Sequence, residues 1–88
     1  MAIVHIPPQM RDLTDGDAEV RVSGGSVRQV LQELERRHPG FEDRLVLDGR
    51  IAPGLALSID NEVTSLGLLA RVGDQSVVHI VAAIAGGA

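Results

Sequence analysis

The side chains that could act as acids, bases, nucleophiles or metal ligands are few and scattered along this sequence. There are three histidines, His5, His38 and His79, and no cysteine. His38 follows a predicted helix, where a positive charge interacts favourably with the helix dipole. His5 and His79 fall on predicted strands that could be neighbours. Two strand histidines without a third ligand do not make a convincing metal site, so we interpret them as structural or interface residues.

The remaining polar residues form no recognisable catalytic pattern. The twelve carboxylates are scattered over predicted loops and helix surface, and no pair flanks an obvious cleft. The acidic group Asp60-Asn61-Glu62 lacks the spacing of a calcium loop. Gly24-Gly25 precedes a helix without the pattern of a phosphate-binding loop. No serine has a histidine and an acid arranged to activate it. By elimination, no side chain is predicted to be a catalyst, and no bound cofactor or metal is expected.

The main-chain carboxylate is the chemical group that this elimination leaves. Residues 82–88, Ala-Ala-Ile-Ala-Gly-Gly-Ala, follow an apolar run, and their small side chains cannot close a hydrophobic core. Six extended residues span about 20 Å, and glycine lets a backbone lie flat against a partner. A partner could activate such a terminus, for instance as an acyl-adenylate. We therefore predict a flexible tail that threads into a partner's active site through Ala83, Ile84, Ala85, Gly86 and Gly87. A frayed terminus without function is the alternative.

The composition limits the classes of partner. The 88 residues are enough for one small domain, and the absence of cysteine fits a reducing cytosol. With Phe41 as the one aromatic residue and a net charge of -4, the chain lacks the features of a nucleic-acid-binding protein. No apolar run reaches membrane-spanning length. We expect a cytoplasmic protein that binds neither nucleic acid nor membrane. All eight basic residues are arginine, so the chain offers no lysine for isopeptide attachment.

One helix is predicted with clear boundaries. Ser26 and Gln29 have the spacing of a capping box, and Pro39-Gly40 ends the segment. Glu33 and Arg37 have the spacing of a helical ion pair. The apolar residues recur at helical intervals and form one stripe; they are Val27, Val30, Leu31 and Leu34.

Strands are predicted on both sides of this helix, at residues 2–6, 18–23, 55–59, 62–63 and 77–81. Residues 41–45 are interpreted as a turn and residues 66–69 as an apolar loop. These elements predict an α+β roll with a mixed four- to five-stranded sheet and one main helix across one face. The last strand is apolar except at His79, which implies an apolar patch on the uncovered face. We predict that this face, including His5, His79 and Val81, binds partners.

The chain resembles the MoaD/ThiS family of ubiquitin-like sulfur carriers. The tail Ala83-Ile84-Ala85-Gly86-Gly87, after the strand sequence of residues 74–81, is similar to the family's ending. The helix sequence of residues 26–34 and His38-Pro39-Gly40-Phe41 are similar to the family's helix and its exit. The resemblance covers nearly the whole chain. It implies a β-grasp domain at residues 1–81 followed by the tail at residues 82–88.

The resemblance also implies a mechanism. In such proteins an E1-like adenylyltransferase uses ATP to adenylate the terminal glycine, and sulfur from a persulfide or from sulfide then displaces AMP. Gly87 would become a thiocarboxylate, and a biosynthetic enzyme would take its sulfur for molybdopterin, thiamine thiazole, cysteine or a specialised metabolite. ATP and the sulfur source would be used by the activating partner. The chain would be a protein cosubstrate rather than an enzyme.

The sequence departs from this family at two positions. Ala82 stands where proline is common, and Ala88 follows Gly87, although the family ends at Gly-Gly. We expect a metalloprotease to remove Ala88; a pseudo-carrier that binds without reacting is the alternative. Two other classes of protein also remain open. One is a ubiquitin-like modifier joined to lysines of other proteins, and the other is a β-grasp interaction domain with a non-reactive tail.

Overall fold

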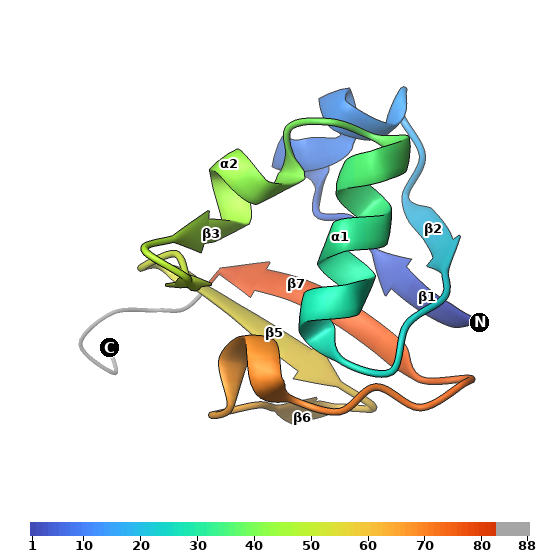
Figure 1. Ribbon diagram of the computed structural model, residues 1–88. Coiled ribbons are helices and arrows are strands. Elements are labelled where there is room, and N and C mark those ends of the chain that lie inside the picture. The colour runs from blue at the N-terminus through green and yellow to red at the C-terminus, as the bar shows by residue number, and fades with distance from the viewer. Residues whose placement is uncertain (83–88) are drawn as a thin grey trace.

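A mixed sheet of five strands forms the centre of the computed structural model, which describes residues 1–82 (Figure 1). The elements, in chain order, are β1 (Ala2–His5), η1 (Pro8–Thr14), β2 (Glu19–Val22), α1 (Val27–Arg37), α2 (Phe41–Leu45), β3 (Val46–Leu47), β4 (Arg50–Ile51), β5 (Leu55–Ile59), β6 (Glu62–Val63), η2 (Gly67–Leu69) and β7 (Val77–Ala82).

The strands of the main sheet lie in the order β2-β1-β7-β5-β6, and β3 and β4 form a separate hairpin. β1 and β7 are parallel, whereas the other neighbouring pairs are antiparallel. β7 is therefore central, although it is the last strand in the sequence. The predicted mixed sheet with one main helix is confirmed.

The helix α1 forms where the sequence predicts it, and both predicted residues take part in its cap, although Gln29 bonds to Gly25 instead of Ser26. The Ser26 hydroxyl accepts a hydrogen bond from the backbone N–H of Gln29 at 3.3 Å. The Gln29 side chain in turn accepts one from the N–H of Gly25 at 2.7 Å. All four residues of the apolar stripe are buried. Their burial contributes about 6–12 kcal/mol as an upper bound.

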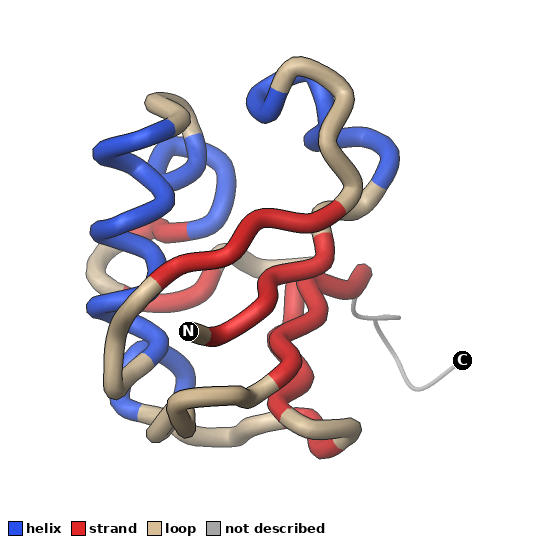
Figure 2. The backbone as a smooth tube through the Cα atoms, turned by 90° about the vertical axis from the view of Figure 1, so that its right-hand side faces the viewer, coloured by secondary structure: helices blue, strands red, loops and turns tan. Residues whose placement is uncertain are grey.

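The two faces of the main sheet have different environments. Figure 2 shows α1 on one side of the strands. Alternate residues on that side form the core; among them are Val4, Val20, Val22, Leu57, Val78 and Ile80. The intervening residues of β1 and β7, such as Ile3 and Val77, point to the opposite side, the outer face, and are half-buried.

The prediction of a turn at residues 41–45 is wrong, because these residues form the short helix α2. Gly40 ends the preceding segment with a φ of +116°, and the Glu35 carboxylate accepts hydrogen bonds from the N–H groups of Gly40 and Glu42. Phe41 and Leu45, four residues apart, are buried on one side of α2. The expectation that these two residues reach the core is confirmed.

Two short 3-10 helices lie outside the predicted helix and strands. The polar segment after Pro7 is the 3-10 helix η1, and its buried Thr14 donates a hydrogen bond to the carbonyl of Asp17 at 2.7 Å. In the predicted apolar loop, the 3-10 helix η2 buries Leu68 but leaves Leu66 and Leu69 exposed. Ala18 is exposed and precedes β2 rather than belonging to it. No helix within residues 1–82 is long and apolar enough to cross a membrane.

Candidate functional site

The strand β7 positions the start of the predicted tail. It pairs with β1 on one side and with β5 on the other, and the last pair joins Leu55 to Ala82. Ala82, the first residue assigned to the tail, therefore belongs to a central strand. The predicted tail residues Ala83, Ile84, Ala85, Gly86 and Gly87, and Ala88, which we predict to be removed, lie outside the described residues.

The first residues of β7 are fixed by Asp60, which follows β5. Its carboxylate accepts hydrogen bonds from the N–H of Val77 at 2.9 Å and from the hydroxyl of Ser76 at 2.8 Å. The hydrogen bond from Val77, followed by that from Ser76, holds the pKa of Asp60 below its ordinary value. Both ends of β7 are therefore fixed: the first residues by Asp60, in the turn after β5, and the last residue by its pairing with β5.

The predicted partner-binding residues lie together on the outer face. His5 and His79 are directly paired across β1 and β7, and their imidazole rings are stacked with centroids 4.3 Å apart. Val81 lies two residues along β7 and pairs with Ala56 of β5. The sequence places both histidines on strands, and the structure shows that these strands are neighbours.

A polar row crosses the outer face at the histidine pair. Glu19 of β2 pairs with His5, and its carboxylate lies 3.6 Å from the His5 Nδ1 atom. Ser58 of β5 pairs with His79 on the other side. The two imidazoles therefore form a flat, polar centre between the apolar residues Val77 and Val81. The sequence alone does not predict this row, because strand alternation gives the face of a residue but not its partner on the next strand.

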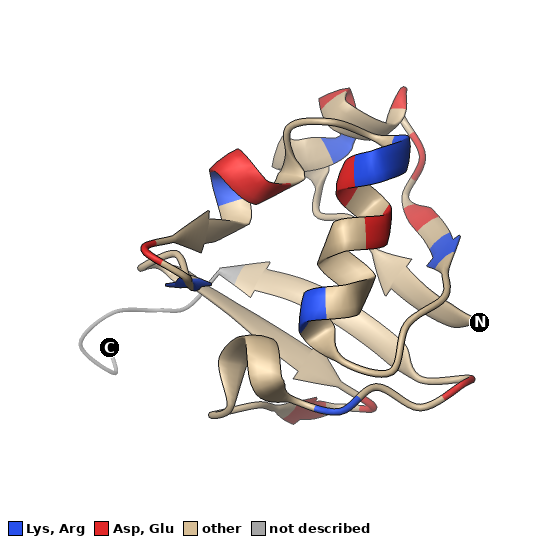
Figure 3. Cartoon of the chain, in the orientation of Figure 1, with Lys and Arg blue, Asp and Glu red and all other residues tan. Residues whose placement is uncertain are grey.

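The side chains of the outer face can make hydrogen bonds and apolar contacts. Imidazole nitrogens donate and accept hydrogen bonds, and the half-buried apolar neighbours can contact a partner. No group of three or more histidine, aspartate or glutamate side chains within residues 1–82 is arranged to hold a metal ion. Figure 3 shows no aspartate, glutamate or arginine on β5 or in the described part of β7.

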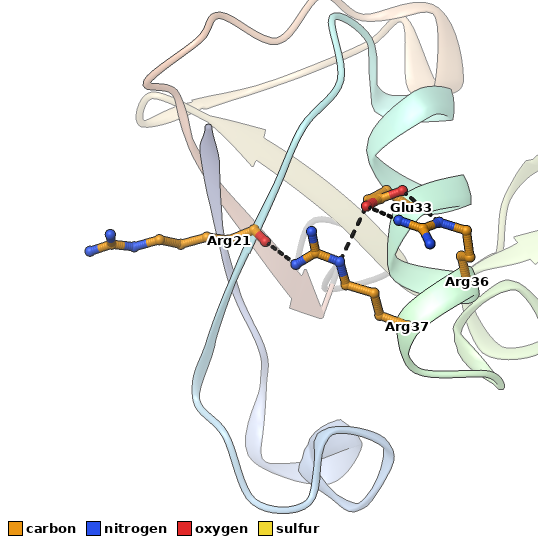
Figure 4. Close-up of polar contacts among 4 residues, drawn as sticks. All are labelled: Arg21, Glu33, Arg36 and Arg37. Atoms are coloured by element: carbon orange, nitrogen blue, oxygen red, sulfur yellow. Dashed lines mark hydrogen bonds and ion pairs between the residues drawn. The ribbon is translucent and has the colours of Figure 1, made fainter.

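Charged side chains fix α1 against the edge strand β2 (Figure 4). The Glu33 carboxylate accepts hydrogen bonds from Arg36 at 2.6 Å and from Arg37 at 3.2 Å, which confirms the predicted pair with Arg37. Arg37 also donates a hydrogen bond to the carbonyl of Arg21 at 2.8 Å. This contact joins the end of the helix to the strand that carries Glu19.

The fold and the central position of β7 define the class of the protein, which is the ubiquitin-like β-grasp class. The ThiS family model matches residues 4–87, and the chain belongs to this family of sulfur carriers. The match ends at Gly87 and leaves Ala88 outside.

Individual relatives agree with this assignment. The sulfur carrier protein CysO of Mycobacterium tuberculosis (strain ATCC 25618 / H37Rv) is 30% identical over an alignment of 89 positions, which covers 96% of this chain and 96% of that protein. A chain in the crystal structure of the Amycolatopsis orientalis BexX/CysO complex has a TM-score of 0.91 and 30% identity, with 99% of this chain and 100% of that chain covered. The small archaeal modifier protein 1 of Methanosarcina acetivorans has a TM-score of 0.79, 20% identity and coverage of 98% and 95%; this likeness shows the fold alone.

Proposed function

We propose that the chain carries sulfur as a thiocarboxylate at Gly87 and donates it to a biosynthetic enzyme. The observation that supports this most directly is the family match, which extends through Gly86 and Gly87. Full-length similarity to a protein named as a sulfur carrier supports it further. The chain would act as a protein cosubstrate, since the reacting group belongs to its main chain.

The proposed reaction has two steps. In the first, a carboxylate oxygen of Gly87 attacks the α-phosphorus of ATP in an E1-like adenylyltransferase, and pyrophosphate leaves. In the second, a sulfur nucleophile attacks the acyl carbon, the bond to AMP breaks, and AMP leaves. With sulfide, this gives the thiocarboxylate directly. With a cysteine persulfide, a thiol must then reduce the sulfur–sulfur bond.

Removal of the residue after Gly87 must precede activation. While Ala88 is attached, the Gly87 carbonyl belongs to a peptide bond and has no free carboxylate. We propose that a metalloprotease hydrolyses the bond between Gly87 and Ala88. The family match ends at Gly87, which supports Gly87 as the reactive terminus.

The outer face is the proposed docking surface for the activating and accepting enzymes. It carries His5, His79 and Val81 on the two central strands, and β7 leads from it directly into the predicted tail. A partner that contacts this face therefore also lies close to the start of the tail.

The test uses two versions of the protein, one ending at Gly87 and one ending at Ala88. Each is incubated with the cognate activating enzyme, ATP and sulfide, and its intact mass is measured. The version ending at Gly87 should gain the mass that corresponds to replacement of one oxygen by sulfur, whereas the version ending at Ala88 should not change. No mass change in the Gly87 version would refute the proposal.

The other two classes predict different results in the same assay. A protein modifier would form adducts with lysines of other proteins, visible on a denaturing gel. A non-reactive interaction domain would keep its partner binding after deletion of residues 86–88. A sulfur carrier would lose sulfur transfer after this deletion.

A further inference from the structure

A groove on the helix side of the molecule has no role in the proposed sulfur chemistry. It lies between the first turn of α1, the β3–β4 hairpin and η2 and has a volume of about 380 Å³. Figure 1 shows the short helix η2 beside α1, away from the outer face. None of the outer-face residues His5, His79 and Val81 lines it.

Two of the apolar residues that line the groove are largely exposed to solvent. Leu66 and Leu69 of the η2 region are 64% and 73% exposed, and Ile51 and Leu68 complete the apolar lining. Leu47, on the same hairpin as Ile51, is 53% exposed and lines the adjoining hollow. Isolated exposed leucines are normal, but apolar side chains gathered around one groove are typical of an interaction site.

The charge of the groove indicates the chemistry of its ligand. Within residues 1–82, the charged residues that line it are Arg28 and Arg50, although the chain has a net charge of -4. Neither guanidinium makes an ion pair or a side-chain hydrogen bond within residues 1–82, whereas Arg36, Arg37 and Arg44 pair with carboxylates there. An apolar groove with two available guanidinium groups complements a ligand that carries both apolar groups and carboxylates.

We propose that this groove binds a short segment of a partner protein in which one or two large apolar side chains are flanked by aspartate or glutamate. The apolar side chains would contact Leu66, Leu69 and Ile51, while the carboxylates would pair with Arg28 and Arg50. A volume of about 380 Å³ is small for a ligand pocket and suits side chains of a peptide rather than a folded domain.

The groove is connected to the start of the predicted tail through β5, which pairs with β7. Ile51 precedes Leu55 by four residues, which span at most about 14 Å, and Leu55 pairs with Ala82. A protein that holds the tail could therefore contact the groove with a separate segment. The groove itself requires no sulfur chemistry, so its test and the test of the proposed function are independent.

The probe is a blocked acidic peptide, acetyl-Asp-Leu-Glu-Leu-Asp-amide, with the corresponding lysine peptide acetyl-Lys-Leu-Lys-Leu-Lys-amide as its control. Each is titrated into the full-length, isotope-labelled protein and followed by amide NMR spectra. The acidic peptide should shift the amides of Arg28, of residues 49–51 and of residues 66–69. Equal shifts with both peptides, shifts confined to other regions, or no shifts would overturn the proposal.

Charge variants test the role of the arginines. Arg50→Glu should weaken binding of the acidic peptide at least about fivefold, because one attraction becomes a repulsion. Arg28→Glu should do the same without loss of the fold, since a negative charge is favourable in the first turn of a helix. Arg21→Glu on β2 is the matched control: it changes the net charge equally but lies outside the groove. An equal effect of Arg21→Glu would contradict the proposed site.

An apolar variant distinguishes a partner segment from a second copy of the chain. Leu69→Ser should abolish the peptide shifts, whereas Val63→Ser, at an equally exposed residue outside the groove, should retain them. Sedimentation velocity measures self-association of the same variants. A dimer that Leu69→Ser dissociates, without any effect of the peptide, would assign the groove to a second copy and overturn the proposal.

Discussion

The imidazole rings of His5 and His79 stack across the junction of β1 and β7, with an angle of 4° between their planes. The pair forms the centre of the outer face, and Glu19 lies beside His5 at the edge. A side chain on a central strand with no described helix above it is well placed to contact a partner. His79 is therefore expected to contribute to partner binding.

We expect His79→Ala to weaken binding of the activating enzyme by about 1–2 kcal/mol, or roughly 5–30-fold, because it removes both a flat contact and a hydrogen-bonding group from the centre of the interface. Titration calorimetry measures the affinity. His79→Phe separates the two contributions, since it retains an aromatic ring without the nitrogens. His38→Ala, at the end of α1, is the control and should leave the affinity unchanged. If His38→Ala and His79→Ala have the same effect, the outer face is not the docking surface.

The hydrogen bonds of Asp60 predict a specific dependence of stability on pH. Its pKa is lowered from 3.8, first by the N–H of Val77 and then by the hydroxyl of Ser76. A lowered carboxyl pKa contributes stability that is fully present above the unfolded-state value and is lost as the pH falls through the folded-state value. Thermal melts between pH 2 and 6 should therefore show a smaller acid-induced decrease for Asp60→Asn than for the unmodified chain.

Asp43→Asn is the control for this measurement, because Asp43 is exposed and accepts no side-chain hydrogen bond within the described residues. The acid-induced decrease of Asp43→Asn should therefore be larger than that of Asp60→Asn. Equal slopes for Asp60→Asn and Asp43→Asn would mean that the contacts of Asp60 contribute nothing to the acid dependence.

The helix α1 and the strand segments could be predicted from the sequence because their periodicities are local. Ser26, Gln29 and the apolar stripe all lie within three turns, so neighbouring residues contain the full pattern. The helix α2 has five residues, and its single spaced pair, Phe41 and Leu45, is too short to show a period. The carboxylate that caps it, Glu35, belongs to the preceding helix and reveals its role only in three dimensions.

Some features of the candidate site could likewise be predicted from local sequence, and others could not. The sequence places His5, His79 and Val81 on one face, since alternation along a strand is local. The stacking of His5 on His79 depends on the register of a parallel pair whose members are 74 residues apart, and no local pattern encodes that register. Likewise, Arg28 and Arg50 are remote in sequence, so their shared groove could not be predicted.

The apolar stripe of α1 gives a prediction about stability. Val30 is 1% exposed and packs in the core, so Val30→Asp places an unpaired charge there and should cost about 3–5 kcal/mol. Such a loss is comparable to the stability of a small domain, and circular dichroism should show a largely unfolded chain. Gln32→Asp, on the exposed side of the same helix, is the control and should melt within a few degrees of the unmodified protein. A folded Val30→Asp variant with an unchanged midpoint would exclude the stripe from the core.

Gly24, at the start of the turn into α1, should not tolerate a side chain. Its φ is +150°, and an added Cβ would lie 2.9 Å from the backbone nitrogen of Val30. Because that nitrogen belongs to the helix backbone, it cannot move aside as a flexible side chain would. We expect Gly24→Ala to lower the free energy of unfolding by about 2–4 kcal/mol, the sum of backbone strain and overpacking.

Gly16→Ala separates the effect of backbone strain from the effect of overpacking. Gly16 also has a positive φ, +93°, but an added Cβ would find no atom within 4 Å. Chemical denaturation should therefore show a loss of only about 1–2 kcal/mol for Gly16→Ala, which reflects strain alone. Equal losses for the two variants would show that contact with Val30 contributes nothing, and that the turn before α1 can shift away from the helix. The larger loss expected at Gly24 instead means that this turn is packed directly against the first turns of α1, so that the start of the helix and the end of β2 are fixed together.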